Sequence, residues 1–368
     1  MAERDRPLVL LAAGGTGGHL FPAESLAVAL ARRGIVVDLA TDHRATRYGS
    51  TFPARETHVV RSDTFRSRNP LALAKTASVL GIGFVNAWWL LGRLRPAAVV
   101  GFGGYPTLPP LMAAAFRGIP SIIHEQNAVM GRANRLLAPR VTAIATSFAG
   151  VAQDTRKASF TGNPVRPAVI AAAGIPYDPP TASGPLRLVV FGGSQGARIM
   201  ADIVPSAIER LDPALRARLS ILQQARDEDL SRVKDAYARL GVSAEVAPFF
   251  ADLPARIAAG HLVVSRSGAS TIAELAAIGR PAILVPLPNA LDQDQRANAG
   301  VLEQAGGAIR VSQDDFTPER LAQAIAGFAA APERLTAMSV AAKSAGAIDA
   351  AERLADLVVR VAGVKGTP

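Results

Sequence analysis

The stretch Leu8-Val-Leu-Leu-Ala-Ala-Gly14-Gly15-Thr16-Gly17-Gly18-His19 decides the fold of this chain. It reads as a buried apolar strand, a glycine-rich turn with one hydroxyl, and the start of a helix. A second stretch of the same form, Leu186-Arg-Leu-Val-Val-Phe-Gly192-Gly193-Ser194-Gln195-Gly196-Ala197, lies in the second half of the chain. Such loops let the N–H groups at a helix start hold an anion. The pair therefore predicts two nucleotide-binding α/β domains.

Bulk composition limits the classes of function. The chain has 368 residues, 49% of them hydrophobic, so it can bury two cores and is not expected to be disordered. Its net charge of +10 favours an anionic partner. Nucleic acid is disfavoured, because there is no run of basic residues and only 5% of residues are aromatic. Cysteine is absent and the five histidines include no H-E-x-x-H pair, so no zinc site is expected.

Strand and helix patterns alternate along the chain, which predicts parallel sheets with right-handed crossovers. We expect strands at 8–13, 35–40, 98–101, 121–124, 141–145, 186–191, 220–223, 243–247, 262–265 and 282–285. We expect early helices at 22–33 and 107–116, and a long alanine-rich helix over 339–364.

A segment rich in proline and glycine, residues 162–185, is the best candidate for a domain boundary. We therefore expect an N-terminal domain over 1–163 and a C-terminal domain over 164–340. The C-terminal helical segment, 341–368, is long enough to cross back to the first domain. The sequence alone does not show whether it packs there.

His19 stands directly after the first glycine loop, at the start of the predicted helix. The positive end of a helix disfavours imidazolium, and a neutral imidazole can act as a general base. A histidine that only caps the turn is the structural alternative. The dinucleotide fingerprint G-x-G-x-x-G is not matched, because Leu20 occupies the third glycine position.

Two polar clusters follow other predicted strands, where open α/β sheets bind ligands. The first, His124-Glu125-Gln126-Asn127, has a solvated loop as its alternative. The second is the small-residue turn Ser265-Arg266-Ser267-Gly268-Ala269-Ser270-Thr271, followed by Glu274, whose carboxylate could accept hydrogen bonds from a ribose diol. Its alternative is a capping box with Ser270 or Thr271 as the N-cap.

Two acidic triplets, Asp227-Glu228-Asp229 and Asp292-Gln293-Asp294, have the D-x-D form that can hold a metal on a nucleotide diphosphate. Such triplets are common on protein surfaces, so we expect neither a metal nor a cofactor. Gln295 and Asn298, three apart on a predicted helix, are better candidates for binding a sugar.

These motifs together resemble the MurG family of GT-B glycosyltransferases, which convert lipid I to lipid II in peptidoglycan synthesis. The matching segments lie between about residues 8 and 300: Gly-Gly-Thr-Gly-Gly-His-x-x-Pro (14–22), Gly-Gly-Tyr (103–105), His-Glu-Gln-Asn (124–127), Gly-Asn-Pro-Val-Arg (162–166), Gly-Gly-Ser-Gln-Gly-Ala (192–197), Ser-Arg-Ser-Gly-Ala (265–269) and Gln295 to Asn298. The resemblance implies two Rossmann-like domains that face a cleft.

The resemblance also implies the substrates, UDP-N-acetylglucosamine as donor and lipid I as acceptor, with inversion in a single displacement. The implied donor-binding residues are Thr16, Gly17, Gly18, Asn127, Arg166, Ser194, Phe250, Ala269, Ser270, Thr271, Glu274 and Gln295. The implied acceptor-binding residues are Gly14, Gly15, Gly103, Gly104, Tyr105 and Glu125. His19 is the implied base, and Asn127 helps to position the reacting sugars.

The chain departs from the family pattern at two places. Gln223-Gln224-Ala225-Arg226 stands where many members have His-Gln-x-Gly, which puts a glycine contact near the donor in doubt. Asp294 replaces a His or Gln of relatives, so this position need not contact sugar.

Residues 76–92 contain no charge, hold both tryptophans and are flanked by Lys75, Arg93 and Arg95. This pattern is typical of an interfacial membrane contact, with a core helix as the alternative. We expect no segment that spans a bilayer and no signal peptide. The resemblance implies a peripheral protein on the cytoplasmic face of the plasma (inner) membrane. An anionic membrane surface and other cell-wall synthesis proteins would be its partners.

Three other classes of protein remain as alternatives. Another GT-B glycosyltransferase, acting on a glycolipid or natural product, is disfavoured by the motifs at 103–105 and 124–127. An NAD-linked oxidoreductase is disfavoured by the missing third glycine. A non-catalytic protein that binds anionic lipid would bind membranes without transferring sugar.

Overall fold

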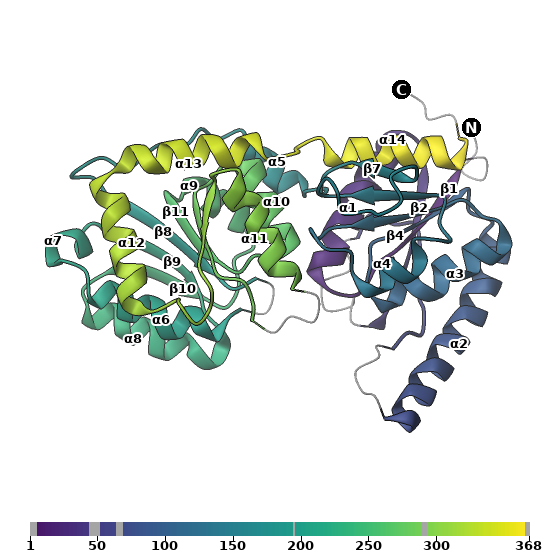
Figure 1. Ribbon diagram of the computed structural model, residues 1–368, viewed down its shortest axis with the longest axis horizontal. Helices are drawn as coiled ribbons and strands as arrows, with labels where there is room; N and C mark the ends of the chain where they lie inside the picture. The colour runs from purple at the N-terminus through teal and green to yellow at the C-terminus, as the bar shows by residue number, and fades with distance from the viewer. Residues whose placement is uncertain (1–5, 44–51, 64–68, 194–195, 289–292, 365–368) are drawn as a thin grey trace. The chain divides into compact units, whose positions relative to one another are not determined.

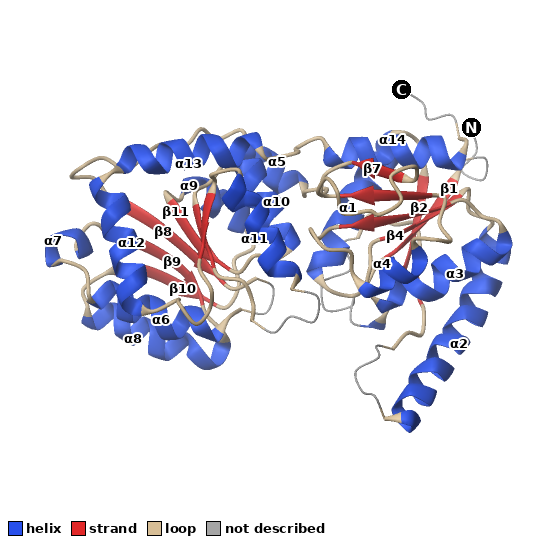
Figure 2. Ribbon diagram, in the orientation of Figure 1, coloured by secondary structure: helices blue, strands red, loops and turns tan. Residues whose placement is uncertain are grey.

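The chain forms two compact units in this computed structural model (Figures 1 and 2), which describes residues 6–43, 52–63, 69–193, 196–288 and 293–364. Unit 1 comprises Met1–Arg166 and Ile348–Pro368, and unit 2 comprises Pro167–Ala347. The divisions fall after residue 166 rather than 163, and after 347 rather than 340. The proline-rich stretch at the first division includes a short helix, α5 (Pro167–Ala173).

Unit 1 is built on a parallel sheet in the order β3-β2-β1-β4-β5-β6-β7. Its strands are β1 (Leu8–Ala12), β2 (Val36–Thr41), β3 (Thr57–Val59), β4 (Ala98–Gly101), β5 (Ser121–Glu125), β6 (Ala143–Thr146) and β7 (Ala158–Phe160). Along β1, Val9 and Leu11 face one core and Leu10 and Ala12 the other. Helices cover both faces of the sheet, which is why β1 is apolar at every position.

The helices of unit 1 form two layers. One face of the sheet carries α1 (Gly17–Arg32) and α14 (Ala350–Ala362), and the other carries α2 (Pro70–Leu94), α3 (Leu108–Arg117) and α4 (Arg132–Leu137). Figure 1 shows α14, the last helix, lying beside α1, the first. Ion pairs join the two, from Arg32 and Arg33 to Glu352 and from Arg33 to Asp356.

The C-terminal residues do not form the single long helix that their composition predicted. One helix, α13 (Pro332–Ser344), ends in unit 2 and α14 begins at Ala350. Between them, Gly346 lies so close to helix α10 (Ala269–Ile278) that an added methyl group would be 2.7 Å from the carbonyl oxygen of Ala276. The chain must therefore turn at this glycine, and the break lets α14 belong to unit 1.

Unit 2 repeats the plan with a parallel sheet in the order β10-β9-β8-β11-β12-β13. Its strands are β8 (Leu186–Phe191), β9 (Leu219–Gln224), β10 (Ser243–Ala247), β11 (Leu262–Ser265), β12 (Ala282–Leu284) and β13 (Ala308–Arg310). Its other helices are α6 (Arg198–Glu209), α7 (Pro213–Arg216), α8 (Leu230–Arg239), α9 (Leu253–Ala259), α10 (Ala269–Ile278), α11 (Asp294–Gln304) and α12 (Pro318–Ala330). The predicted fold class, α/β with two parallel sheets, is confirmed.

Candidate functional site

Apart from Arg166, which follows β7, the predicted site residues of unit 1 lie at the ends of β1, β4 and β5, three neighbouring strands of the parallel sheet. Their carboxyl ends share one edge, so the loops that follow them meet there. After β1, helix α1 begins at Gly17, five residues earlier than expected, and includes Pro22. His19 is therefore in the first turn of α1 rather than ahead of it.

The imidazole of His19 lies against two glycine segments. A methyl group added at Gly14 would be 3.2 Å from a carbon of this ring, and one at Gly103 or Gly104 would be 3.4 Å from a ring atom. Gly103 and Gly104 both have positive φ angles, +80° and +76°, which favour glycine. The glycines of both motifs thus make room for the ring of His19.

Glu125, at the end of β5, is buried and holds the loop that follows it. Its Oε1 accepts hydrogen bonds from the backbone N–H and the side-chain amide of Asn127, at 3.0 and 3.2 Å. Its Oε2 accepts from the N–H of Gly131 and the amide of Asn134, at 2.9 and 2.8 Å. Burial raises the pKa of Glu125 and these four bonds oppose the rise. The predicted pair Glu125 and Asn127 is therefore in direct contact.

His124 is fully buried and joins three segments of unit 1. Its Nε2 lies 3.0 Å from the carbonyl oxygen of Gly162, and its Nδ1 lies 3.2 Å from the amide nitrogen of Gln126. Gln126 also donates to the carbonyl oxygen of Phe102, directly before the Gly103 turn. Burial lowers the pKa of His124 to about 4, so the ring is neutral at pH 7 and suits a structural role rather than a basic one.

The glycine loop of unit 2 is described at Gly192, Gly193, Gly196 and Ala197, whereas the predicted Ser194 lies outside the described residues. A methyl group at Gly192 would be 2.2 Å from the backbone nitrogen of Ala197, so no other residue fits there. Gln224 accepts from the N–H of Gly192 at 3.1 Å and donates to the carbonyl oxygen of Pro248 at 3.1 Å. It thereby ties the loop to the segment that carries the predicted Phe250.

Helix α10 begins inside the small-residue turn at 265–271, which was predicted to bind the donor. Its N-cap is Gly268, which has no side chain to bond the first turn, so the capping-box interpretation is wrong. Ala269, Ser270 and Thr271 form the first turn, and Glu274 lies buried one turn later. Among the described residues, no side chain caps the first turn of α1, α6 or α10, and none of these turns holds an acidic residue. Their N–H groups therefore suit an anionic ligand.

Gln295 and Asn298, paired as sugar-binding candidates, have different surroundings. The Oε1 atom of Gln295 accepts from the N–H of Leu287 at 3.0 Å, so the amide is oriented. Asn298 is completely buried and donates to the carbonyl oxygen of Ser267 at 3.2 Å. The amide of Asn298 is thus engaged inside unit 2, and sugar binding by this residue stays a prediction.

Arg166 lies in unit 1, with its guanidinium 4.2 Å from the centre of the Phe21 ring on α1. Nearby, burial raises the pKa of Glu24 and the charge of Arg166 opposes the rise. In unit 2, Phe250 is buried, and the guanidinium of Arg256 lies 5.9 Å from its ring. The two predicted donor-binding residues are thus held by cation–π contacts, each inside its own unit.

Comparisons with known proteins agree with this architecture. Residues 9–146 match the glycosyltransferase family 28 N-terminal domain, and residues 187–354 match the C-terminal domain of the same family. The chain is 66% identical, over 98% of its length and 100% of the relative's, to a UDP-N-acetylglucosamine–N-acetylmuramyl-(pentapeptide) pyrophosphoryl-undecaprenol N-acetylglucosamine transferase from Rhodopseudomonas palustris. The chain belongs to the MurG family.

Two further relatives extend the comparison of this MurG-family chain. A transferase of the same name from Bradyrhizobium diazoefficiens is 63% identical over 97% of this chain and 99% of its own. A crystal structure of MurG from Acinetobacter baumannii superposes with a TM-score of 0.78 at 28% identity. It covers 96% of this chain and 99% of its own, so both units and their connections share its fold.

In the first acidic triplet of this MurG-family chain, two of the carboxylates form ion pairs with arginines. Asp229 is paired with Arg226 at 2.7 Å and with Arg232 at 2.8 Å, and Arg226 also pairs with Glu228. These contacts favour a structural role over a metal site. In the second triplet, Asp292 lies outside the described residues.

One group that the sequence did not indicate could offer three metal-ligand atoms within the described part of the chain. These atoms belong to Asp38, Glu56 and His58 and lie within 4.8 Å of one another. Arg55 donates to both oxygens of Asp38, at 2.9 and 2.7 Å, and His58 lies 2.9 Å from one of them. These groups therefore form an ion-pair network with Arg55.

The apolar segment of this MurG-family chain is helix α2, which packs along α3 (Figure 1). Only a narrow stripe of α2 is buried: Thr76, Gly83, Ala87 and Leu91. Among the described residues, α2 is the one helix long and apolar enough to cross a membrane by length and composition, with 17% of its apolar window buried. Length and composition alone are weak evidence for a span, so the described residues show no clear transmembrane segment.

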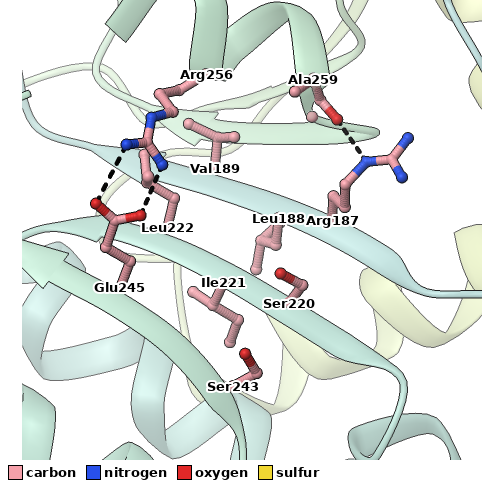
Figure 3. A pocket seen from close by; sticks show the side chains of 11 residues that line it. Arg187, Leu188, Val189, Ser220, Ile221, Leu222, Ser243, Glu245, Arg256 and Ala259 are labelled. Atoms are coloured by element: carbon pink, nitrogen blue, oxygen red, sulfur yellow. Dashed lines mark hydrogen bonds and ion pairs between the residues drawn. The ribbon is translucent and has the colours of Figure 1, made fainter. Parts of the chain in front are cut away.

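A hollow lies on a face of the unit 2 sheet over β8, β9 and β10 (Figure 3). Arg256 from α9 pairs there with Glu245, and Arg187 donates to the carbonyl oxygen of Ala259. Ser220 and Ser243 add hydroxyls. None of the predicted site residues lines this hollow, so it is separate from the loops that follow the strands.

Proposed function

We propose that this protein transfers N-acetylglucosamine from UDP-N-acetylglucosamine to the C4 hydroxyl of the muramoyl sugar of lipid I, which forms lipid II. The observation that carries the proposal is the near-full-length identity, 66% and 63%, to transferases named for this reaction. The two glycine loops and the polar edge of unit 1 supply the groups that such a transfer needs. Peptidoglycan synthesis is the pathway in which lipid II is used.

Unit 2 is proposed to bind the donor. The diphosphate would lie against the N–H groups of the glycine loop and of the first turn of α10, with Ser194, Ala269, Ser270 and Thr271 as neighbours. Glu274 would accept hydrogen bonds from the ribose. Phe250 would lie beside the uracil, and Gln295 would donate its amide N–H to a sugar hydroxyl, since its oxygen already accepts from Leu287.

Unit 1 is proposed to bind the acceptor and to remove its proton. The pyrophosphate of lipid I would meet the glycine segments Gly14–Gly18 and Gly103–Tyr105, which surround His19. The imidazole would take the proton of the C4 hydroxyl as its oxygen attacks C1 of the donor sugar. The bond from C1 to the diphosphate would then break, with inversion and release of UDP. Arg166 would stabilise the charge on the leaving diphosphate.

Asn127 is proposed to position the reacting sugars, and Glu125 to act through it. All four contacts of the Glu125 carboxylate go to the loop from Asn127 to Asn134. This geometry supports a positioning role for Glu125 rather than the direct acceptor contact that the family resemblance implied. We also propose that Thr16, Gly17 and Gly18 contact the donor sugar.

A transfer assay tests the proposed function. Purified protein would be given labelled UDP-N-acetylglucosamine and a short-chain analogue of lipid I, with a glycolipid that lacks the muramoyl sugar as the control acceptor. We expect label in the lipid II analogue and none in the control. Tight UDP binding with no transfer to the lipid I analogue would contradict the proposal and would favour another acceptor.

We also propose that α2 rests on an anionic membrane surface, on the cytoplasmic face of the plasma membrane. Ile82, Val85 and Trp89, spaced as one helical stripe, are 46%, 51% and 72% exposed. On the neighbouring α3, Phe116 is 66% exposed. Lys75, Arg93 and Arg95 flank the stripe on α2 and are exposed. Apolar side chains beside basic ones suit binding to an anionic interface, while the buried stripe keeps α2 on unit 1.

Vesicle flotation tests this surface. The triple variant Ile82→Ser, Val85→Ser, Trp89→Ser should lose binding to phosphatidylglycerol vesicles without a fall in melting temperature, because these side chains are exposed. Phe84 and Trp88 are unsuitable targets, since their rings pack 6.0 Å apart and Arg117 stacks on Trp88.

The matched control for flotation replaces three exposed apolar residues of unit 2, Ile170, Ile175 and Val340, by serine. This control should float like the wild type. Equal loss of binding in both triple variants, or in neither, would contradict the proposed surface.

A further inference from the structure

Asn163, in the Gly-Asn-Pro-Val-Arg motif, has an unusual environment. The residue is 5% exposed, yet neither its amide oxygen nor its amide nitrogen has a hydrogen-bond partner in the described part of the chain. Folded proteins pair the large majority of their buried side-chain polar atoms. Leaving a buried polar group unpaired costs about 1–3 kcal/mol. The position of Asn163 therefore calls for an explanation.

The backbone on either side of Asn163 is fixed. The N–H of Gly162 donates to the carbonyl oxygen of Thr146 at 3.2 Å, at the end of β6. The carbonyl oxygen of Gly162 accepts from His124 at 3.0 Å and from the Thr161 hydroxyl at 3.1 Å. Gly162 has a φ of +80°, and Pro164 follows Asn163. The unpaired amide is thus held in place rather than left on a loose loop.

The same edge of the sheet holds a second unpaired polar group. Ser147 directly follows Thr146, is 6% exposed, and its hydroxyl has no partner among the described residues. Its backbone N–H donates to the carbonyl oxygen of Glu125 at 2.9 Å. Other buried amides behave differently, since Gln126, Gln223 and Gln224 all make hydrogen bonds. The Gly162–Thr146 hydrogen bond joins the two segments that carry these unpaired groups, and together they point to a ligand.

We propose that Asn163, with Ser147 beside it, binds a hydroxyl or acetamido group of an N-acetylhexosamine. An amide offers one acceptor and two N–H donors, and a serine hydroxyl offers both, which matches the polar groups of such a sugar. The loop that carries Asn163 is joined through His124 and Gln126 to the turn at Gly103, which contacts His19. The inference rests on the proposed function, because donor and acceptor both carry an N-acetylhexosamine.

Asn163→Leu tests this role, because leucine has nearly the shape of asparagine but no polar atoms. A group kept unpaired for a substrate destabilises the free protein. The variant should therefore keep or raise the melting temperature while kcat/KM falls about 10- to 100-fold, as expected for a lost hydrogen bond to substrate. Asn163→Asp keeps the acceptor but removes the donors, and should also lower kcat/KM.

Thr161→Val provides a matched control in the same loop. The Thr161 hydroxyl does have a partner, the carbonyl oxygen of Gly162. Its removal should lower the melting temperature and leave the KM values for both substrates close to those of the wild type. Opposite stability changes in the two variants would separate a ligand-binding group from a structural one.

The KM values identify the sugar that Asn163 contacts. If only the KM for UDP-N-acetylglucosamine rises, Asn163 contacts the transferred sugar. If only the KM for the lipid I analogue rises, Asn163 contacts the muramoyl sugar. Either result supports the proposal. A lower melting temperature in Asn163→Leu with unchanged kinetics would overturn it. Failure of the wild type to transfer sugar would instead remove the proposed function, whereas the stability result for Asn163→Leu would still stand.

Discussion

The two units use the same scaffold at their strand ends but fill it with different chemistry. In both, a parallel strand leads through a glycine loop into a helix whose first turn has no side-chain cap. In unit 1 that edge is lined by ionisable and amide side chains, His19, Glu125 and Asn127. In unit 2 the first turn of α10 consists of Ala269, Ser270 and Thr271.

The difference indicates a division of labour. Small residues and backbone N–H groups can hold a nucleotide diphosphate without moving protons, which suits unit 2 to binding. Arg266 beside it is engaged with the carbonyl oxygens of Val285 and Pro286, whereas the hydroxyls of Ser265 and Ser270 have no partner among the described residues. Unit 1 instead places an imidazole among glycines, where a substrate hydroxyl could reach it.

Substitutions in the two glycine loops should have the largest effect and test the division between the units most strongly. Gly192→Ala places a methyl group 2.2 Å from the backbone of Ala197, whereas Gly18 has nothing within 4 Å of its added methyl group. We expect Gly192→Ala to lower UDP affinity at least about 100-fold, because the loop must move. Titration of UDP by calorimetry would measure this.

Gly18→Ala is the counterpart in unit 1. It should leave the melting temperature unchanged or raise it, since alanine favours a helix over glycine by about 1 kcal/mol. If the donor sugar approaches this backbone, the KM for UDP-N-acetylglucosamine should rise. Equal loss of UDP affinity in both variants would contradict the division between a binding unit and a catalytic unit.

A third comparison concerns the buried histidines, His124 in unit 1 and His261 in unit 2, whose pKa values are both lowered to about 4 by burial. The unfolded chain takes up these protons near pH 6.5, and the folded chain does so only near pH 4. The free energy of unfolding should therefore fall as the pH drops through this window, by about 3 kcal/mol for His124.

Urea unfolding between pH 7 and pH 4.5 would test this. His124→Gln, which keeps a neutral donor for Gly162, should show a shallower loss of stability than the wild type. His261→Gln is the matched variant in unit 2. An unchanged pH dependence in His124→Gln would mean that His124 does not lose its charge on folding.

Much of the fold could be predicted from short apolar runs in the sequence. The strands β4, β8, β10 and β11 have the predicted bounds. Of these, β4, β8 and β11 are short, mostly buried runs between turn residues, whereas β10 is an edge strand in which only Val246 is buried. The strands β3, β7 and β13 were missed: each has three residues, and each lies at the edge of its sheet. The start of α1 was also misplaced, since the glycines at 17 and 18 are poor helix formers.

The site was only partly accessible from the sequence. Sequence motifs predicted His19, Glu125, Asn127 and Glu274 as site residues, but the roles of neighbouring residues depend on packing. Asn298 shares a helix with Gln295 and yet points into the core. The unpaired amide of Asn163 has no sequence signal, because only the surroundings of a polar group show whether it has a partner.

The central claim, that unit 1 supplies the base and unit 2 binds the donor, is tested most directly by His19→Ala. Transfer to the lipid I analogue and UDP affinity would be measured on the same preparation of this variant and of the wild type. We expect kcat to fall by roughly 10²–10⁴ while UDP affinity stays unchanged, because a general base acts on the acceptor hydroxyl. Near-normal turnover, or loss of UDP binding in parallel with turnover, would contradict the account.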